Sequence, residues 1–180
     1  MRKPIFDNEN AYSAFCLENR LIPLSEGFMS ETNEYQRAAR SLESYGVFAS
    51  GTLGRSMRPL LREGKDVVIV RKNDAPPKKY DVVLYGRAGK CVLHRVIRKK
   101  GDMNLIRGDN TYTLEFVKDS EILGILMEFD RGKKHHTTNE FFYKLYSIVW
   151  TFIYPLRCAL VSLRALLVRI FFKFFPKKKR

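Results

Sequence analysis

Three short motifs in the chain carry residue types that can do acyl-transfer chemistry. Ser56 lies in the first, Gly-Arg-Ser-Met-Arg-Pro. His94 lies in the second, Leu-His-Arg-Val-Ile, and Asp109 in the third, Arg-Gly-Asp-Asn, which follows soon after. The chain therefore offers a hydroxyl nucleophile, an imidazole base and a carboxylate, in that order, within the length of one small domain.

A serine hydroxyl becomes a useful nucleophile only when a neighbouring group accepts its proton and is itself held in orientation. Histidine suits this role because its ordinary pKa of about 6.5 lets it accept and return a proton near neutral pH. Each motif is weak alone, whereas the ordered set with Ser56, His94 and Asp109 predicts a hydrolytic site.

The order and spacing of the motifs resemble the type I signal peptidase superfamily. The pattern G-x-S-M-x-P, D-V-V-I-V, K-x-D-V-V, H-R-V-I and G-D-N runs from about Gly51 to Gly124. The bacterial branch and the SOS-repressor autoproteases use a lysine as base, whereas this chain has His94, as the endoplasmic-reticulum and archaeal branch does. The resemblance implies a serine endopeptidase with Ser56 as nucleophile and His94 as general base.

The resemblance leaves two candidates for the acidic residue that completes the catalytic set. Asp109 lies within the G-D-N motif, and Glu115 lies at a later spacing. Asp109 could equally form the turn through its own side chain, as Asp commonly does. Both residues are therefore kept as catalytic candidates.

The oxyanion site departs from the family pattern. Signal peptidases commonly have a hydroxyl residue two positions before the nucleophile, where this chain has Gly54, and Arg55 replaces a small residue. We expect the Ser56 backbone N–H and a second donor, such as Thr52 or another backbone amide, to hold the oxyanion, with Met57 packing beside the site. Losing one donor typically costs about 10²–10³ in rate, which predicts a slow or specialised enzyme.

The resemblance and the mode of edge-strand recognition predict a peptide or protein substrate, bound as an extended strand with small side chains near the cut. We expect no metal or cofactor, because Cys91 and His94 form a lone C-x-x-H without the second half of a zinc site. The cysteines Cys16, Cys91 and Cys158 have no close-spaced pair, which predicts no disulfide framework and is consistent with a reducing compartment.

The elements that position these residues are mainly strands. β-Branched and apolar runs separated by turn residues predict strands at 66–72, 80–85, 91–98, 104–107 and 121–129. Many short strands predict a mainly β fold, a signal-peptidase-like barrel or sandwich, with a helical hydrophobic tail. A short helix at 32–45 precedes them, with Ala38, Leu42 and Tyr45 on its apolar face.

The strand at 91–98 predicts which of its side chains face the cleft. Because neighbours on a strand alternate faces, His94 and Val96 share the cleft side, while Leu93 and Arg95 point away. We expect Arg95 to be structural and to pair with an acid near the cleft.

These elements divide the chain into four parts. Residues 1–46 form an N-terminal arm with the short helix, 47–130 the catalytic domain, 131–140 a linker and 141–180 a basic hydrophobic tail. The first 30 residues carry several charges and no apolar core of the length that a secretory signal needs. We expect His135 and His136 to be solvated in the linker.

Charge and hydropathy indicate that the tail associates with a membrane. The formal net charge is +14, and from residue 141 onward there are nine Lys or Arg and no Asp or Glu. The longest uncharged run, 145–156, is too short to cross a bilayer, which takes about 20 residues. We expect two helical pieces lying in the interface of an anionic membrane, and no nucleic-acid partner. An inner-leaflet position would place the catalytic domain at the cytoplasmic face.

Other interpretations of the tail and of the function stay open. The tail could instead form a helical hairpin that packs on the core or on a partner, or a tilted span with snorkelling Arg side chains. The chain could be a non-catalytic membrane adaptor that kept the fold, since fold does not fix function, and Gly54 and Arg55 favour this alternative. It could also be an autoprotease that cuts its own arm.

Overall fold

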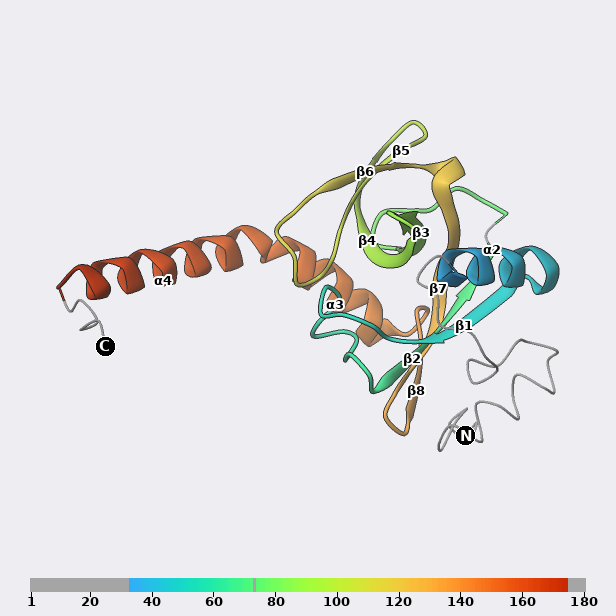
Figure 1. The fold of residues 1–180 in the computed structure, drawn as a ribbon, viewed down its shortest axis with the longest axis horizontal. Helices are drawn as coiled ribbons and strands as arrows, with labels where there is room; N and C mark the ends of the chain where they lie inside the picture. Colours follow the sequence, from blue (N-terminus) through green and yellow to red (C-terminus); the bar gives the residue numbers. More distant parts are fainter. Residues whose placement is uncertain (1–32, 73, 175–180) are drawn as a thin grey trace.

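A computed structural model describes residues 33–72 and 74–174 of the chain, which form an antiparallel sheet and three α-helices (Figure 1). The helices are α2 (Asn33–Tyr45), α3 (Phe141–Phe152) and α4 (Tyr154–Phe174). The strands are β1 (Val47–Gly51), β2 (Asp66–Arg71), β3 (Val82–Arg87), β4 (Lys90–Lys100), β5 (Met103–Arg107), β6 (Glu115–Lys118), β7 (Ile122–Arg131) and β8 (Lys134–Thr137). A short 3-10 helix, η1 (Asp119–Glu121), joins β6 to β7. Most of the expected arm, 1–32, and the end of the tail, 175–180, lie outside the described residues.

The strands form one sheet in which every pair is antiparallel. Their spatial order is β1-β2-β7-β3-β4-β5-β6, and β8 pairs with β7 off this path. The prediction of a mainly β protein is therefore confirmed. Short turns join β3, β4 and β5 as hairpins, whereas β7 returns from late in the chain to lie between β2 and β3.

The helix α2 lies beside β1 and covers part of the sheet (Figure 1). Ala38 and Leu42 are buried against residues of β1, β2 and β3, as their helical spacing predicts. The expectation for Tyr45 is wrong, because this side chain is 46% exposed. Tyr45 is the last residue of the helix, and Gly46, with φ of +71°, turns the chain away into β1.

Half of the segment expected to be a linker, 131–140, instead belongs to the sheet. β7 continues to Arg131, and after a tight turn β8 pairs back onto it. His135 Nδ1 lies 2.8 Å from Asp130 Oδ1, and the His136 ring stacks on Phe129 with ring centroids 5.2 Å apart. Both histidines are half-buried rather than solvated because the hairpin holds them against β7.

The tail forms two helices with different surroundings. α3 packs on the body of the protein through the buried Tyr143 and Ser147, whereas α4 extends away from it (Figure 1). Leu160, Leu163 and Leu167 on α4 are each more than half exposed. Among the described residues no single helix is long and apolar enough to cross a membrane. By length and composition alone, α3 together with residues 154–168 could do so as a pair bent by 51°.

The close packing of β7 against β2 predicts a specific sensitivity at Gly124. A Cβ there would lie 2.6 Å from the backbone oxygen of Arg71 and 2.8 Å from Val70 Cγ1, and the backbone oxygen cannot swing aside. Overpacking of this kind costs about 1–3 kcal/mol, so we expect Gly124→Ala to lower the free energy of unfolding in urea by about that amount. The matched control is Gly51→Ala, where a Cβ would meet nothing within 4 Å. Equal losses in the two variants would contradict this packing argument.

Candidate functional site

Ser56 lies in the loop between β1 and β2, on a turn that the hydrophobic core anchors. The next residue, Met57, is 5% exposed and packs in one cluster with Leu60 and Leu61. The Leu61 N–H donates to the Met57 carbonyl at 3.0 Å. Gly54, two residues before Ser56, has a φ of +82°, a backbone conformation that side-chain-bearing residues rarely adopt. The loop therefore holds the half-buried Ser56 on a fixed backbone.

The Gly-Asp-Asn turn lies directly against the Ser56 loop. The Asn110 N–H donates to the Ser56 carbonyl at 2.7 Å, and Asn110 Nδ2 donates to the Arg55 carbonyl at 3.3 Å. Within the turn, the Thr111 N–H donates to the Gly108 carbonyl at 3.1 Å. The Gly-Asp-Asn motif therefore positions the backbone of the Ser56 motif through hydrogen bonds that do not involve the Asp109 side chain.

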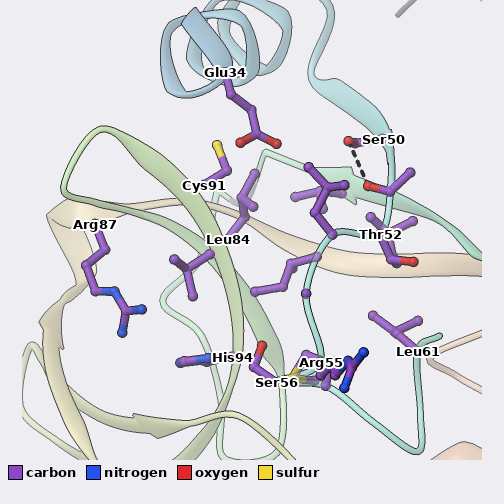
Figure 2. Close-up of a pocket in the computed structure, with 18 of the residues that line it drawn as sticks. Glu34, Ser50, Thr52, Arg55, Ser56, Leu61, Leu84, Arg87, Cys91 and His94 are labelled. Atoms are coloured by element: carbon purple, nitrogen blue, oxygen red, sulfur yellow. Dashed lines mark hydrogen bonds between the residues drawn. The ribbon is translucent and has the colours of Figure 1, made fainter. Parts of the chain in front are cut away.

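Gly108 brings the candidate nucleophile and base to a common point. A Cβ on Gly108 would lie 3.0 Å from His94 Nε2 and 3.0 Å from Ser56 Cβ, so both side chains border the same small space. Figure 2 shows the Ser56 side chain beside the His94 ring. Among the described residues, no hydrogen bond joins Ser56 Oγ to His94 Nε2 in this conformation. Such bonds are often long in the free enzyme and tighten when substrate binds.

The other ring nitrogen of His94 faces a tyrosine and a glutamate. Nδ1 lies 3.1 Å from Tyr85 Oη and 3.6 Å from Glu115 Oε1. Tyr85 Oη donates to Glu115 Oε2 at 3.0 Å, and Arg87 Nη1 donates to Glu115 Oε1 at 2.6 Å. These side chains from β3, β4 and β6 form a continuous polar chain that leads from the cleft to the surface.

Burial lowers the pKa of His94 below its ordinary value, and Arg87 acts in the same direction. The carboxylates of Glu115 and Asp109 oppose this shift but do not reverse it. His94 is therefore neutral at neutral pH and has a ring nitrogen that can accept a proton. Burial and the Glu115 carboxylate raise the pKa of Tyr85, so its hydroxyl keeps its proton.

Asp109 is buried and pairs with Arg95, so of the two acidic candidates it is Glu115 that lies at Nδ1 of His94. Arg95 Nε and Nη2 each donate to one Asp109 carboxylate oxygen at 2.8 Å, and neither residue is more than 4% exposed. Tyr146 Oη donates to the same carboxylate at 2.9 Å. Both oxygens are engaged behind the site, and Asp109 affects His94 through its charge alone.

The helices of the tail hold the same turn from outside. Trp150 Nε1 and Arg157 Nη1 both donate to the Asp109 carbonyl, at 2.9 and 3.0 Å. The Arg157 guanidinium lies over the Trp150 ring, 3.8 Å from its centroid. Ser147 on α3 accepts a hydrogen bond of 2.7 Å from Arg95 Nη1. Residues of the predicted membrane segment are therefore contacts of the candidate catalytic turn.

A cleft of about 440 Å³ extends from Ser56 along the edge strand β1. Its lining is largely apolar and includes Phe48, Leu61, Val70 and Leu84. Figure 2 shows Glu34 of α2 at the end away from Ser56. The cleft therefore combines a strand at the end of the sheet with largely apolar walls.

The expected oxyanion donors near Ser56 differ in whether they are free to bind an oxyanion. The Thr52 hydroxyl lies 2.6 Å from the Arg62 carbonyl and 3.0 Å from that of Asp66, so it is engaged in fixing the loop. Gly54 has no side chain to donate. The Ser56 backbone N–H has no hydrogen-bond partner among the described residues, so it can donate to an oxyanion.

Sequence reasoning missed Tyr85 and Arg87, which connect His94 and Glu115 to the rest of the site. A signal for Tyr85 was present, because Ala88 and Gly89 form a tight hairpin turn that fixes the register of β3 on β4. Counting back from that turn pairs Val83 with His94 and places Tyr85 on the same face. The approach of β6, which brings Glu115, depends on the long-range fold and has no local signal.

No protein-family model matches this chain, and no curated protein matches it either.

The buried ion pair predicts a large loss of stability when one partner is removed. Arg95→Met would leave the Asp109 carboxylate buried without its main partner, so we expect the free energy of unfolding to fall by about 3–5 kcal/mol. Urea unfolding measures the change. Arg71→Met is the matched control, because Arg71 pairs with Glu128 at the surface, where such pairs contribute about 0–1 kcal/mol. If Arg95→Met lowered the free energy of unfolding no more than the control, the Arg95–Asp109 pair would not be needed for stability.

Proposed function

We propose that this chain is a serine endopeptidase resembling type I signal peptidases of the Ser-His branch, acting on leader- or signal-type peptides. The observation that carries the proposal is the convergence of Ser56 and His94 Nε2 on Gly108, at the mouth of an apolar cleft. The chemistry of the site supports it too, because burial keeps His94 neutral and able to accept the serine proton.

In the proposed reaction, Ser56 Oγ attacks the scissile carbonyl carbon while His94 Nε2 takes the hydroxyl proton. The imidazolium then gives this proton to the amide nitrogen as the C–N bond breaks, which leaves an ester on Ser56. Water, deprotonated by the same nitrogen, hydrolyses the ester and restores the serine. The Glu115 carboxylate, 3.6 Å from Nδ1, stabilises the transient positive charge of the ring.

The oxyanion formed in this reaction would accept a hydrogen bond from the Ser56 backbone N–H. With the Thr52 hydroxyl engaged elsewhere and no side chain at Gly54, a second donor has to come from another backbone amide or from the substrate complex. Because one oxyanion donor contributes about 10²–10³ in rate, we expect a slow enzyme.

Substrate recognition follows from the edge of the sheet. We propose that the sheet is a signal-peptidase-like barrel or sandwich and that an extended substrate lies along its end strand β1. Small substrate side chains would face the apolar cleft lined by Leu61, Val70 and Leu84.

The tail supports a second part of the proposal, association with anionic lipid. α4 presents exposed leucines, and the whole segment from 141 onward carries basic but no acidic residues. An amphipathic helix of this composition binds the interface through its apolar side and the headgroups through its cations. The protein would then be membrane-associated, with its catalytic domain at the cytoplasmic face.

The protease proposal is tested by comparing protein N-termini in cells that carry the native chain or Ser56→Ala. We expect a set of N-termini that is present with the native chain and absent with the variant, since Ser56 Oγ forms the bond to substrate. Identical profiles from two folded, membrane-bound proteins would support the non-catalytic adaptor instead. An N-terminus of the chain itself among those lost would support the autoprotease, whose cut would fall in the N-terminal arm, 1–46.

The lipid proposal predicts a charge-dependent affinity for vesicles. Each Lys or Arg near an anionic surface contributes about 1 kcal/mol, so Arg164→Gln should weaken binding to phosphatidylglycerol vesicles about fivefold at low salt. Co-sedimentation with the vesicles measures the affinity. Arg131→Gln removes the same charge from an exposed position on β7 and should leave it unchanged. Equal affinities of the Arg164 variant and the native protein would contradict the proposed role of the tail.

A further inference from the structure

The β3–β4 hairpin fixes Tyr85 diagonally across from His94. Val83 pairs directly with His94, and Tyr85 lies two residues further along, on the same face of the sheet. Tyr85 is 2% exposed, and its ring packs in one cluster with Val83 and Val96. The Tyr85 and His94 ring centroids are 5.9 Å apart at an angle of 56°. This packing holds the Tyr85 hydroxyl at the edge of the imidazole.

The donors and acceptors around His94 allow one arrangement of hydrogens at neutral pH. Glu115, as a carboxylate paired with Arg87, can only accept hydrogen bonds. Tyr85 has a single hydroxyl hydrogen, which points to Glu115 Oε2 at 3.0 Å. Toward His94 Nδ1, 3.1 Å away, the tyrosine oxygen therefore offers a lone pair. The hydrogen between these two atoms must belong to Nδ1, which leaves Nε2 unprotonated.

We propose that Tyr85 is a positioning residue whose hydroxyl holds the resting His94 in the Nδ1–H tautomer and aims its unprotonated Nε2 at Ser56. The hydroxyl makes this contact instead of the Glu115 carboxylate, because Glu115 Oε1 lies 3.6 Å from Nδ1, beyond ordinary hydrogen-bond length. Glu115 acts through Tyr85 by accepting its hydrogen. The catalytic meaning of this arrangement rests on the proposed protease function, whereas the tautomer is a property of the resting protein.

Nitrogen-15 NMR of histidine-labelled full-length protein in detergent tests the tautomer without any substrate. In the native protein at neutral pH we expect the His94 signals of an imidazole protonated at Nδ1, assigned by their loss in His94→Gln. In Tyr85→Phe, which keeps the ring and removes the acceptor, we expect a shift toward the Nε2–H form. Tyr45→Phe, which changes an exposed tyrosine at the end of α2, should leave the His94 signals unchanged.

A second readout is the rate at which Ser56-dependent N-termini appear. Because a base in the wrong tautomer cannot take the serine proton, we expect Tyr85→Phe to slow this rate roughly 10²-fold, at the lower end of the contribution of a general base. Tyr45→Phe should cleave at the native rate. Near-ultraviolet circular dichroism checks that the Tyr85 variant keeps its tertiary structure.

Two results would overturn the inference. One is a native His94 that carries its hydrogen on Nε2, and the other is a Tyr85→Phe protein with an unchanged tautomer. The NMR result separates this inference from the proposed function. If no Ser56-dependent N-termini exist while the native protein shows the Nδ1–H form and Tyr85→Phe loses it, then Tyr85 orients His94 in a protein that is not a protease.

Discussion

The buried ion pair between Arg95 and Asp109 is the interaction on which the rest of the site depends. Arg95 follows His94 on β4, so the strand that points the imidazole to one side of the sheet points the guanidinium to the other. There it binds the carboxylate of Asp109, the central residue of the Gly-Asp-Asn turn. The same turn also binds the Ser56 carbonyl, because the Asn110 N–H donates a hydrogen bond to it. One buried charge pair therefore positions both His94 and Ser56.

Burying an ion pair of this kind costs free energy, so it contributes more to the orientation of the Asp109 turn than to net stability. Removing two charges from water is repaid only when the geometry is good and the remaining hydrogen-bonding groups are satisfied. Here the pairing is bidentate, and Tyr146 and Ser147 bind the remaining sites of the two side chains. The planar guanidinium admits one orientation of the carboxylate, so the turn that carries Asp109 can dock against the Ser56 loop in only one way.

The mainly β class and the helix α2 could be predicted because each follows from local sequence patterns. These are runs of β-branched residues, turn residues and apolar residues at helical spacing. The order of the motifs also indicated that Ser56 and His94 would meet, and the structure brings them to the same space. The role of Asp109 could not be separated from that of Glu115, since this depends on how β5 and β6 return to the sheet. The strand β8 was missed because its polar residues, Lys134 to Thr137, have no strand pattern and pair only because β7 provides an edge.

The hydrogen bonds from Trp150 and Arg157 to the Asp109 carbonyl limit where this protein can be truncated. Residue 140 looks like a natural boundary, because the sheet ends just before it and an apolar, basic helical segment begins just after it. A shortened protein ending at that boundary would lose both donors to the carbonyl, the Tyr146 and Ser147 contacts, and the cover over Arg95. The autonomous folding unit therefore extends at least to Arg157. Removing the tail to gain solubility would damage the candidate site itself, and an inactive fragment made that way would say nothing about the activity of the intact molecule.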